Sequence, residues 1–201
     1  MSRKLPGAEY ERLKREGADL IEDYGLAYPL DLRALAAAFG AQVIIHPVSL
    51  PPDAGICGTT DGFTEVVTTS RGPGYKIHMN GARHLSRQRF TLMHELAHIW
   101  LNHLFGADAS LDTLEAEANF FANYVLAPDA LVIAWCPGRT VAEIASVFQM
   151  SDDAARIAFE RVVRATQHVR ADKPHDRRIR DGATLRTRHH IGAATLDLGT
   201  A

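Results

Sequence analysis

The five residues His94–His98 read HELAH, and they constrain the fold of this chain more than any other feature. From Ser86 through Leu104 the sequence contains no proline or glycine, and apolar residues recur at steps of three and four. This pattern predicts a helix that begins at Ser86, a residue type favoured at N-caps. Residues four apart on a helix lie one turn above each other, so His94 and His98 should point from the same side.

This spacing is typical of a hydrolytic metal site. Two neutral imidazoles one turn apart can bind one ion, and Glu95 between them can act as the general base that takes a proton from water. The alternative is a chance match, for which the residue frequencies give a probability on the order of 2 %. The uninterrupted helical context favours a metal site with His94 and His98 as ligands.

Composition places the chain among ordinary globular proteins. It has 201 residues, of which 46 % are hydrophobic and 23 % charged, and its formal net charge is -2. That charge gives no general attraction to nucleic acid or anionic membranes. Cys57 and Cys136 are isolated, which predicts buried or incidental thiols rather than a disulfide framework. No apolar run reaches the roughly 18 residues of a membrane span, so we expect a cytoplasmic protein with no membrane partner.

Upstream of the motif the pattern changes from helices to short strands. Helices are predicted from Ala8 to about Tyr24 and after Asp31, an N-cap residue type, with Gly40 ending the second helix. Strands are predicted in four segments between glycines, prolines and threonines: Gln42–His46, Gly55–Thr59, Phe63–Thr69 and Tyr75–Met79. This order indicates an α+β fold with a small mixed or antiparallel sheet packed on helices.

Downstream of the motif, helices are predicted at Leu111–Leu126 and Asp129–Trp135. Two short helices joined at residues 149–151 follow. We expect three parts along the chain: residues 1–135 form the domain that holds the motif, residues 136–168 form a helix-turn-helix-like helical subdomain, and residues 169–201 form a basic, loosely ordered tail. The tail could contact phosphates, but a solvated segment is the simpler expectation.

A catalytic zinc site usually has three protein ligands and a fourth position for water, so the two histidines need a partner. Glu115 and Glu117 lie on a later predicted helix that a short loop would bring back antiparallel to the motif helix. We favour Glu115, because Asn119 lies four residues later on the same face. There Asn119 could hydrogen-bond a ligating imidazole and fix its tautomer. Glu117 points elsewhere on the helix and is the alternative ligand.

Three other side chains lie near the motif in the sequence. His103 would leave the ligand face of a continuous helix, so we expect an exposed histidine at the helix end rather than a ligand. Tyr75 and His78 lie on the strand that precedes the helix. If that strand is an edge strand, they could line a substrate cleft and present a donor to a developing oxyanion, although packing or solvent contact is the commoner role.

In these motifs the chain resembles the ImmA/IrrE family of metallopeptidases. The resemblance rests on Arg89–His98, Glu115–Ala122 and Val125–Pro128, and it extends over most of the chain except the two ends. There are two departures from the family pattern. Asn102 stands where a histidine is frequent, and the usual Leu-Met-Pro reads Leu-Ala-Pro here.

The resemblance implies a zincin-like domain that acts as a zinc-dependent endopeptidase with a gluzincin-like site. His94, His98 and Glu115 would be ligands of one Zn²⁺ and Glu95 the base, with Mn²⁺ or Fe²⁺ as alternative ions. Family members typically relieve repression, often on prophages or mobile elements, by cutting or disabling a helix-turn-helix repressor. The resemblance therefore implies that the partner is a protein substrate of this kind.

Residues 140–163 look like a helix-turn-helix. Reading DNA needs basic and amide side chains at the start of the second helix, but Asp152 and Asp153 stand there and would repel phosphate. We therefore expect a packing or partner-docking subdomain rather than direct DNA binding. The rival to the enzyme is a non-proteolytic metal-binding regulator that docks a repressor or DNA through residues 140–165 and the basic tail. Glu95 favours the enzyme, because a purely structural metal site does not need it.

Overall fold

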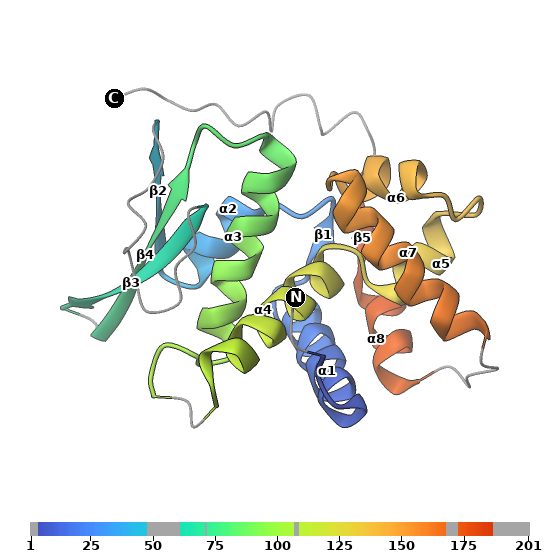
Figure 1. The fold of residues 1–201 in the computed structure, drawn as a ribbon, viewed down its shortest axis with the longest axis horizontal. Helices are drawn as coiled ribbons and strands as arrows, with labels where there is room; N and C mark the ends of the chain where they lie inside the picture. The colour runs from blue at the N-terminus through green and yellow to red at the C-terminus, as the bar shows by residue number, and fades with distance from the viewer. Residues whose placement is uncertain (1–3, 48–60, 71, 107–108, 168–172, 187–201) are drawn as a thin grey trace.

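The computed structural model describes residues 4–47, 61–70, 72–106, 109–167 and 173–186, and its architecture is α+β, as the sequence predicts. The elements in chain order are α1 (Gly7–Asp23), β1 (Ala27–Tyr28), α2 (Leu32–Ala38), β2 (Ala41–His46), β3 (Gly62–Thr69), β4 (Gly72–Asn80), α3 (Leu85–Trp100), α4 (Leu111–Leu126), α5 (Asp129–Trp135), α6 (Val141–Phe148), α7 (Asp152–Gln167), α8 (Pro174–Gly182) and β5 (Thr184–Leu185). Figure 1 shows β2, β3 and β4 on one side of α3, with α1 and α4 to α8 on the other. The predicted strand at Gly55–Thr59 lies outside the described residues.

The three-stranded sheet is mixed, because β2 runs parallel to β4 and β3 runs antiparallel to it. β4 is therefore the central strand. This corrects the expectation that the strand carrying Tyr75 and His78 could be an edge, which the order of strands along the chain could not decide. The register places Thr64 of β3 opposite Ile77 of β4. Since side chains alternate between the two faces, Thr64 and Ile77 share one face and His78 points to the other.

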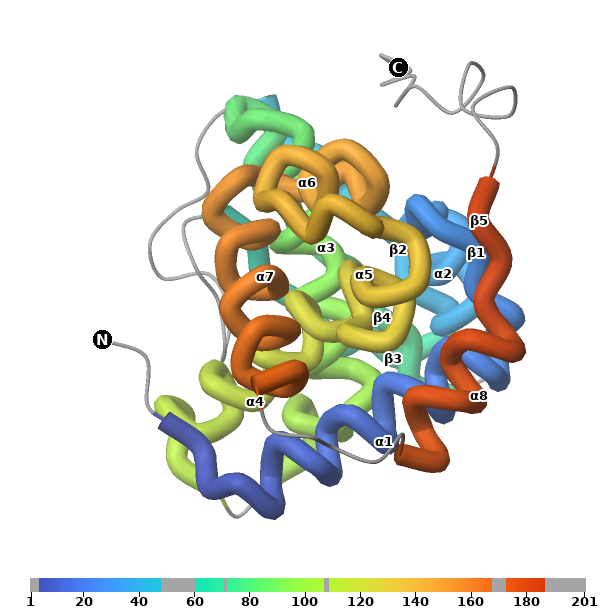
Figure 2. Tube along the Cα trace, turned by 90° about the vertical axis from the view of Figure 1, so that its right-hand side faces the viewer, coloured from blue at the N-terminus to red at the C-terminus, as the bar shows by residue number. Residues whose placement is uncertain are grey.

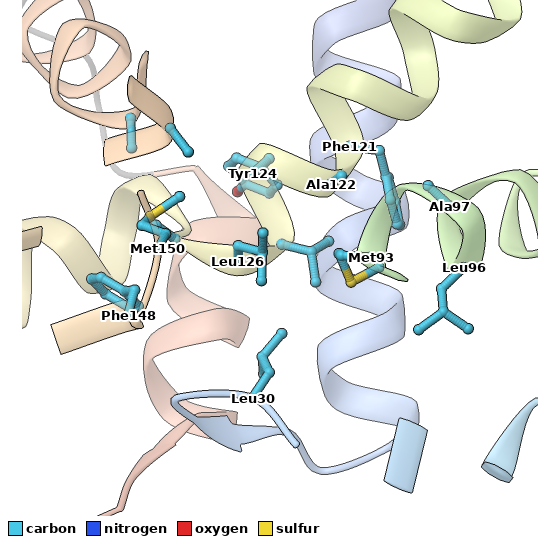
Figure 3. Packing of buried hydrophobic residues seen from close by; sticks show 14 of the residues in the cluster. Leu30, Met93, Leu96, Ala97, Phe121, Ala122, Tyr124, Leu126, Phe148 and Met150 are labelled. Carbon is cyan, nitrogen blue, oxygen red and sulfur yellow. The ribbon is translucent and has the colours of Figure 1, made fainter. Parts of the chain in front are cut away.

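A single cluster of buried apolar residues joins elements along most of the chain. Figure 3 shows Met93 and Leu96 of α3 in this cluster with Phe121 of α4 and Phe148 of α6. All four side chains are buried, and each such burial contributes about 1.5–3 kcal/mol. The helical pair α6 and α7, predicted to form a subdomain of its own, thus shares its core with the elements that precede it.

The segment after α7 differs from the predicted solvated tail. α8 packs along α1, and β5 pairs in parallel with β1, as Figure 2 shows. His175 and Ile179, four residues apart on α8, are buried, while Arg178 forms ion pairs with two acidic residues of α1. The expectation of a loosely ordered tail is therefore wrong for residues 174–185. Among its many arginines, α8 has only a narrow buried face, which the composition does not reveal. Arg178 pairs with carboxylates of α1 rather than with phosphates.

Two smaller observations concern the cysteines and the membrane. Cys136 is a buried free thiol, as its isolation predicts, while Cys57 lies outside the described residues. Within the parts of the chain that the structure describes, no helix is both long and apolar enough to cross a membrane.

Candidate metal centre

The motif helix α3 is shorter than predicted. It begins at Leu85, because His84 rather than Ser86 is the N-cap: the Nδ1 atom of His84 accepts a hydrogen bond of 3.3 Å from the backbone N–H of Ser86. It ends at Trp100 instead of continuing to Leu104. The HELAH residues occupy the last two turns of this helix, and their side chains are all buried.

His94 and His98 of α3 meet Glu115 of α4 where the two helices pack together. The two Nε2 atoms are 3.0 Å apart, and the Glu115 carboxylate lies 3.3 Å from each, through Oε2 to His94 and Oε1 to His98. The side chain of His98 is fully buried and that of His94 nearly so, whereas 26 % of the Glu115 side chain is exposed. The group is therefore open to solvent on the side of the carboxylate.

The spacing of these atoms fits a metal ion. Donor atoms about 2.0–2.1 Å from a tetrahedral zinc ion lie about 3.3 Å from one another. The three separations found here are close to that value. Burial alone would raise the pKa of Glu115, but hydrogen bonds from His94 and His98 and their charges outweigh it and lower the pKa to about 2. The carboxylate is therefore ionised at pH 7.

Glu95 lies beside these three side chains and is almost completely buried. Its Oε2 atom accepts a hydrogen bond of 2.7 Å from Oγ1 of Thr64 on β3, while its Oε1 atom has no hydrogen-bond partner among the described residues. Burial raises the pKa of Glu95, although the charges of His94 and His98 and the Thr64 hydrogen bond oppose that rise. A carboxylate fixed at one oxygen and free at the other is suited to accept a proton.

β3 approaches α3 closely at Gly62. A Cβ atom at this position would lie 2.5 Å from Cγ2 of Thr91 and 3.1 Å from the carbonyl oxygen of His78, so a larger residue would push the strand away from the helix. This close approach lets Thr64 reach Glu95. Neither Gly62 nor Thr64 is among the site residues predicted from the sequence. The sequence offered one signal for Thr64, which is a polar residue at an inward-facing position of the predicted strand Phe63–Thr69.

His103 folds back onto His98 instead of extending from a continuous helix. Asn102 adopts a left-handed conformation (φ 58°), and the backbone N–H of His103 donates to the carbonyl of His98 at 2.9 Å. The N–H of Asn102 donates to the carbonyl of Ile99 at 3.1 Å, which completes a Schellman motif. The expectation of an exposed histidine is therefore wrong, because His103 is 6 % exposed and its Nδ1 atom lies 3.1 Å from Nδ1 of His98.

Glu117 lies behind His103 rather than beside the ligand atoms. Its Oε2 atom is 3.1 Å from Nε2 of His103 and 3.0 Å from a terminal nitrogen of Arg12. Burial, with the charges of His98 and Arg12, lowers the pKa of His103 to about 4, so the ring is neutral at pH 7. Asn119 was expected to hold a ligating imidazole. In the described part of the chain it makes no hydrogen bond to either histidine, and His103 occupies the Nδ1 side of His98 instead.

Tyr75 and His78 are not brought to the metal centre. His78 lies on the sheet face opposite Thr64, where its Nδ1 atom is 2.9 Å from Nε2 of His46 and its ring stacks on Phe63 with centroids 4.5 Å apart. Tyr75 packs against the hydrophobic core. β3, rather than β4, is the strand whose side chain reaches Glu95.

Residues 36–160 match the family described as Peptidase M78, IrrE N-terminal-like domain. The matched segment covers more than half of the chain and contains His94, Glu95, His98 and Glu115. None of the curated proteins compared matches the chain.

Proposed function

This chain belongs to the M78 family of metallopeptidases with an IrrE N-terminal-like domain, and from that membership we propose that it is a zinc-dependent endopeptidase. One observation carries the proposal. Side-chain atoms of His94, His98 and Glu115 converge at separations of 3.0–3.3 Å beside Glu95, one of whose carboxylate oxygens has no hydrogen-bond partner within the described residues. The resemblance of these residues to a gluzincin-type site supports the same assignment.

The mechanism follows from what each side chain can do. His94 and His98 would hold the ion through Nε2 and Glu115 through its carboxylate; a bound zinc ion lowers the pKa of its water toward neutrality and polarises the scissile carbonyl. Glu95 accepts the proton of the attacking water at Oε1 and delivers it to the leaving amine nitrogen. Thr64 holds the other oxygen of Glu95, so the carboxylate keeps its orientation through both transfers.

Zinc is the metal we propose, because two imidazoles and one carboxylate in a compact arrangement are typical ligands of catalytic zinc. Mn²⁺ and Fe²⁺ can use the same donors and are the alternatives. Elemental analysis of the purified protein identifies the bound metal.

We propose that the substrate is a helix-turn-helix transcriptional repressor, cut in the cytoplasm. The resemblance to the ImmA/IrrE family supports this substrate class. The first turn of α7 presents two exposed carboxylates, Asp152 and Asp153, which favour a protein partner over DNA at this surface.

Substituting the base tests the proposed function. Glu95→Gln removes the proton acceptor and keeps the shape of the side chain, so it should abolish cleavage of a helix-turn-helix repressor substrate while zinc stays bound. Mass spectrometry of the products gives the cleavage position, and elemental analysis gives the zinc content of the parent and the variant. Cleavage by the variant at the parental rate would contradict the mechanism.

The same experiment separates the enzyme from a non-proteolytic regulator that docks a repressor or DNA. Such a regulator would bind the repressor without cutting it, and Glu95→Gln would leave the binding unchanged. The buried Oε1 atom of Glu95 has no hydrogen-bond partner in the part of the chain that the structure describes. This argues against the regulator, because such an oxygen costs stability and has no use in a structural site.

A further inference from the structure

We infer that His103 is a positioning residue for the metal ligand His98, and that Glu117 and Arg12 hold His103 in the tautomer this task requires. The inference rests on the proposed function, since it concerns the same metal centre. It adds three residues to that centre, one of them from the N-terminal helix α1.

The hydrogen-bond pattern has one consistent direction. His98 faces the ligand group with Nε2, so a neutral His98 that binds metal carries its proton on Nδ1. That N–H can donate to His103 only if Nδ1 of His103, 3.1 Å away, is unprotonated. The proton of His103 then lies on Nε2, where it donates to Oε2 of Glu117 at 3.1 Å.

Arg12 completes this chain from the outside. Its terminal nitrogen donates to the same Oε2 atom of Glu117 at 3.0 Å, so the carboxylate accepts from both sides. His103 and Glu117 are 6 % and 8 % exposed, and water has little access to replace either contact. When His103 carries its proton on Nε2, each of these three hydrogen bonds joins a donor to an acceptor. In the other tautomer, the N–H at Nδ1 of His103 would face the N–H at Nδ1 of His98.

The two histidine ligands differ in this respect. Nδ1 of His94 is buried and has no hydrogen-bond partner among the described residues, so His98 is the imidazole that an outer side chain orients. Partners of this kind fix the ring orientation and raise the basicity of a ligand. Removing one typically costs about 10–100-fold in metal affinity.

The test compares zinc affinity by chelator competition in four proteins. His103→Phe keeps a ring but loses both nitrogens, and it should bind zinc about 10–100-fold more weakly than the parent. His103→Asn keeps an acceptor near the position of Nδ1 and should recover part of that loss. The control is His175→Phe, which removes a histidine with the same 6 % exposure on α8 and should keep the parental affinity.

Cobalt(II) substitution gives a second readout. The visible absorption of the bound cobalt reports the ligand geometry, so it should change in His103→Phe, return toward the parent in His103→Asn and stay unchanged in His175→Phe. If His103 had only a structural role, His103→Phe would lose stability, but its cobalt absorption would match that of the parent, as in His175→Phe.

Two kinds of failure can be distinguished. If the parent binds no zinc, the proposed function itself is wrong. If the parent binds zinc and His103→Phe binds it within twofold as tightly, the inference about His103 is overturned. Should His103→Phe not fold, Glu117→Met decides: it removes the acceptor behind His103 at similar length, so at least threefold weaker zinc binding supports the inference and parental affinity overturns it.

Discussion

Thr64 links the sheet to the base of the proposed reaction. Its hydroxyl donates to Oε2 of Glu95 at 2.7 Å in a buried environment, and hydrogen bonds to charged groups contribute about 1.5–3 kcal/mol. The bond favours the ionised carboxylate and therefore opposes the rise in the pKa of Glu95 that burial causes. A strand side chain thus adjusts the proton affinity of a residue on a helix.

Thr64→Val removes this bond at nearly constant volume. We expect kcat/KM to fall about 10-fold or more. Because the pKa of Glu95 rises further, the acidic limb of the pH profile should move to higher pH. Thr64→Ser keeps the hydroxyl and should stay close to the parent in both respects. A pH–rate profile of Thr64→Val that overlies the parental one would show that Thr64 does not act on Glu95.

The residues that sequence alone predicted are those whose relation is local. His94, Glu95 and His98 follow from one helical turn, and the choice of Glu115 followed from a helix face and a loop length. The role of Thr64 could not be predicted from the sequence, because its contact with Glu95 depends on how the sheet packs against α3.

The boundaries of helices were also predicted correctly where local sequence signals mark them and wrongly where such signals are weak. The predicted limits of α4 and α5 agree with the structure, because Pro128 and the apolar periodicity mark them in the sequence. The end of α3 was predicted four residues too late, because asparagine is a weaker stop signal than glycine. A left-handed residue at position 102 changes the direction of the chain, and the placement of His103 depends on that turn.

The turn at Asn102 can be tested by stability. Asn102→Val puts a β-branched residue in the left-handed region and should lower the free energy of unfolding by about 1–2 kcal/mol. Asn102→Gly should keep the parental stability or raise it slightly, since glycine favours this conformation. Urea denaturation of the metal-free proteins gives both values. Equal stability of the valine variant and the parent would contradict the role of the turn.

At the scale of the molecule, a buried ion network joins α1, α5 and α7. Asp129 lies 2.6 Å from the amine of Lys14 and 2.5 Å from Nε of Arg161. A terminal nitrogen of Arg161, Nη2, donates to the carbonyl of Ala127 at 2.6 Å. Burial would raise the pKa of Asp129, but the charges and hydrogen bonds of Arg161 and Lys14 outweigh it and lower the pKa. The contribution of Asp129 to stability is therefore present above pH values near 4 and is lost as the pH falls below them.

Asp129→Ala leaves two buried cations without their carboxylate and should lower the free energy of unfolding by about 3–5 kcal/mol at pH 7. A triple variant with Lys14→Met, Asp129→Leu and Arg161→Met replaces the whole network by apolar groups and should be closer to the parent. Chemical denaturation measures both. A triple variant less stable than Asp129→Ala would mean that the charges themselves stabilise the assembly of the helices.

The sequence also underestimated how far the ordered fold extends. Arginine-rich composition suggested solvent for residues 169–201, yet burial of His175 and Ile179 depends on a partner helix at the other end of the chain. Composition describes a segment by itself and contains no information about such a distant partner.

The docking of α8 on α1 also bears on the order in which a newly made chain is completed. Arg178 meets Glu22 across 156 positions of sequence, one of the longest loops this chain can close. During synthesis the surface of α1 that contacts α8 stays uncovered until α8 has been made. The last proposed zinc ligand in the sequence, Glu115, emerges some 60 residues before α8. All the proposed ligands are therefore made while the strip of α1 beneath α8 is still uncovered.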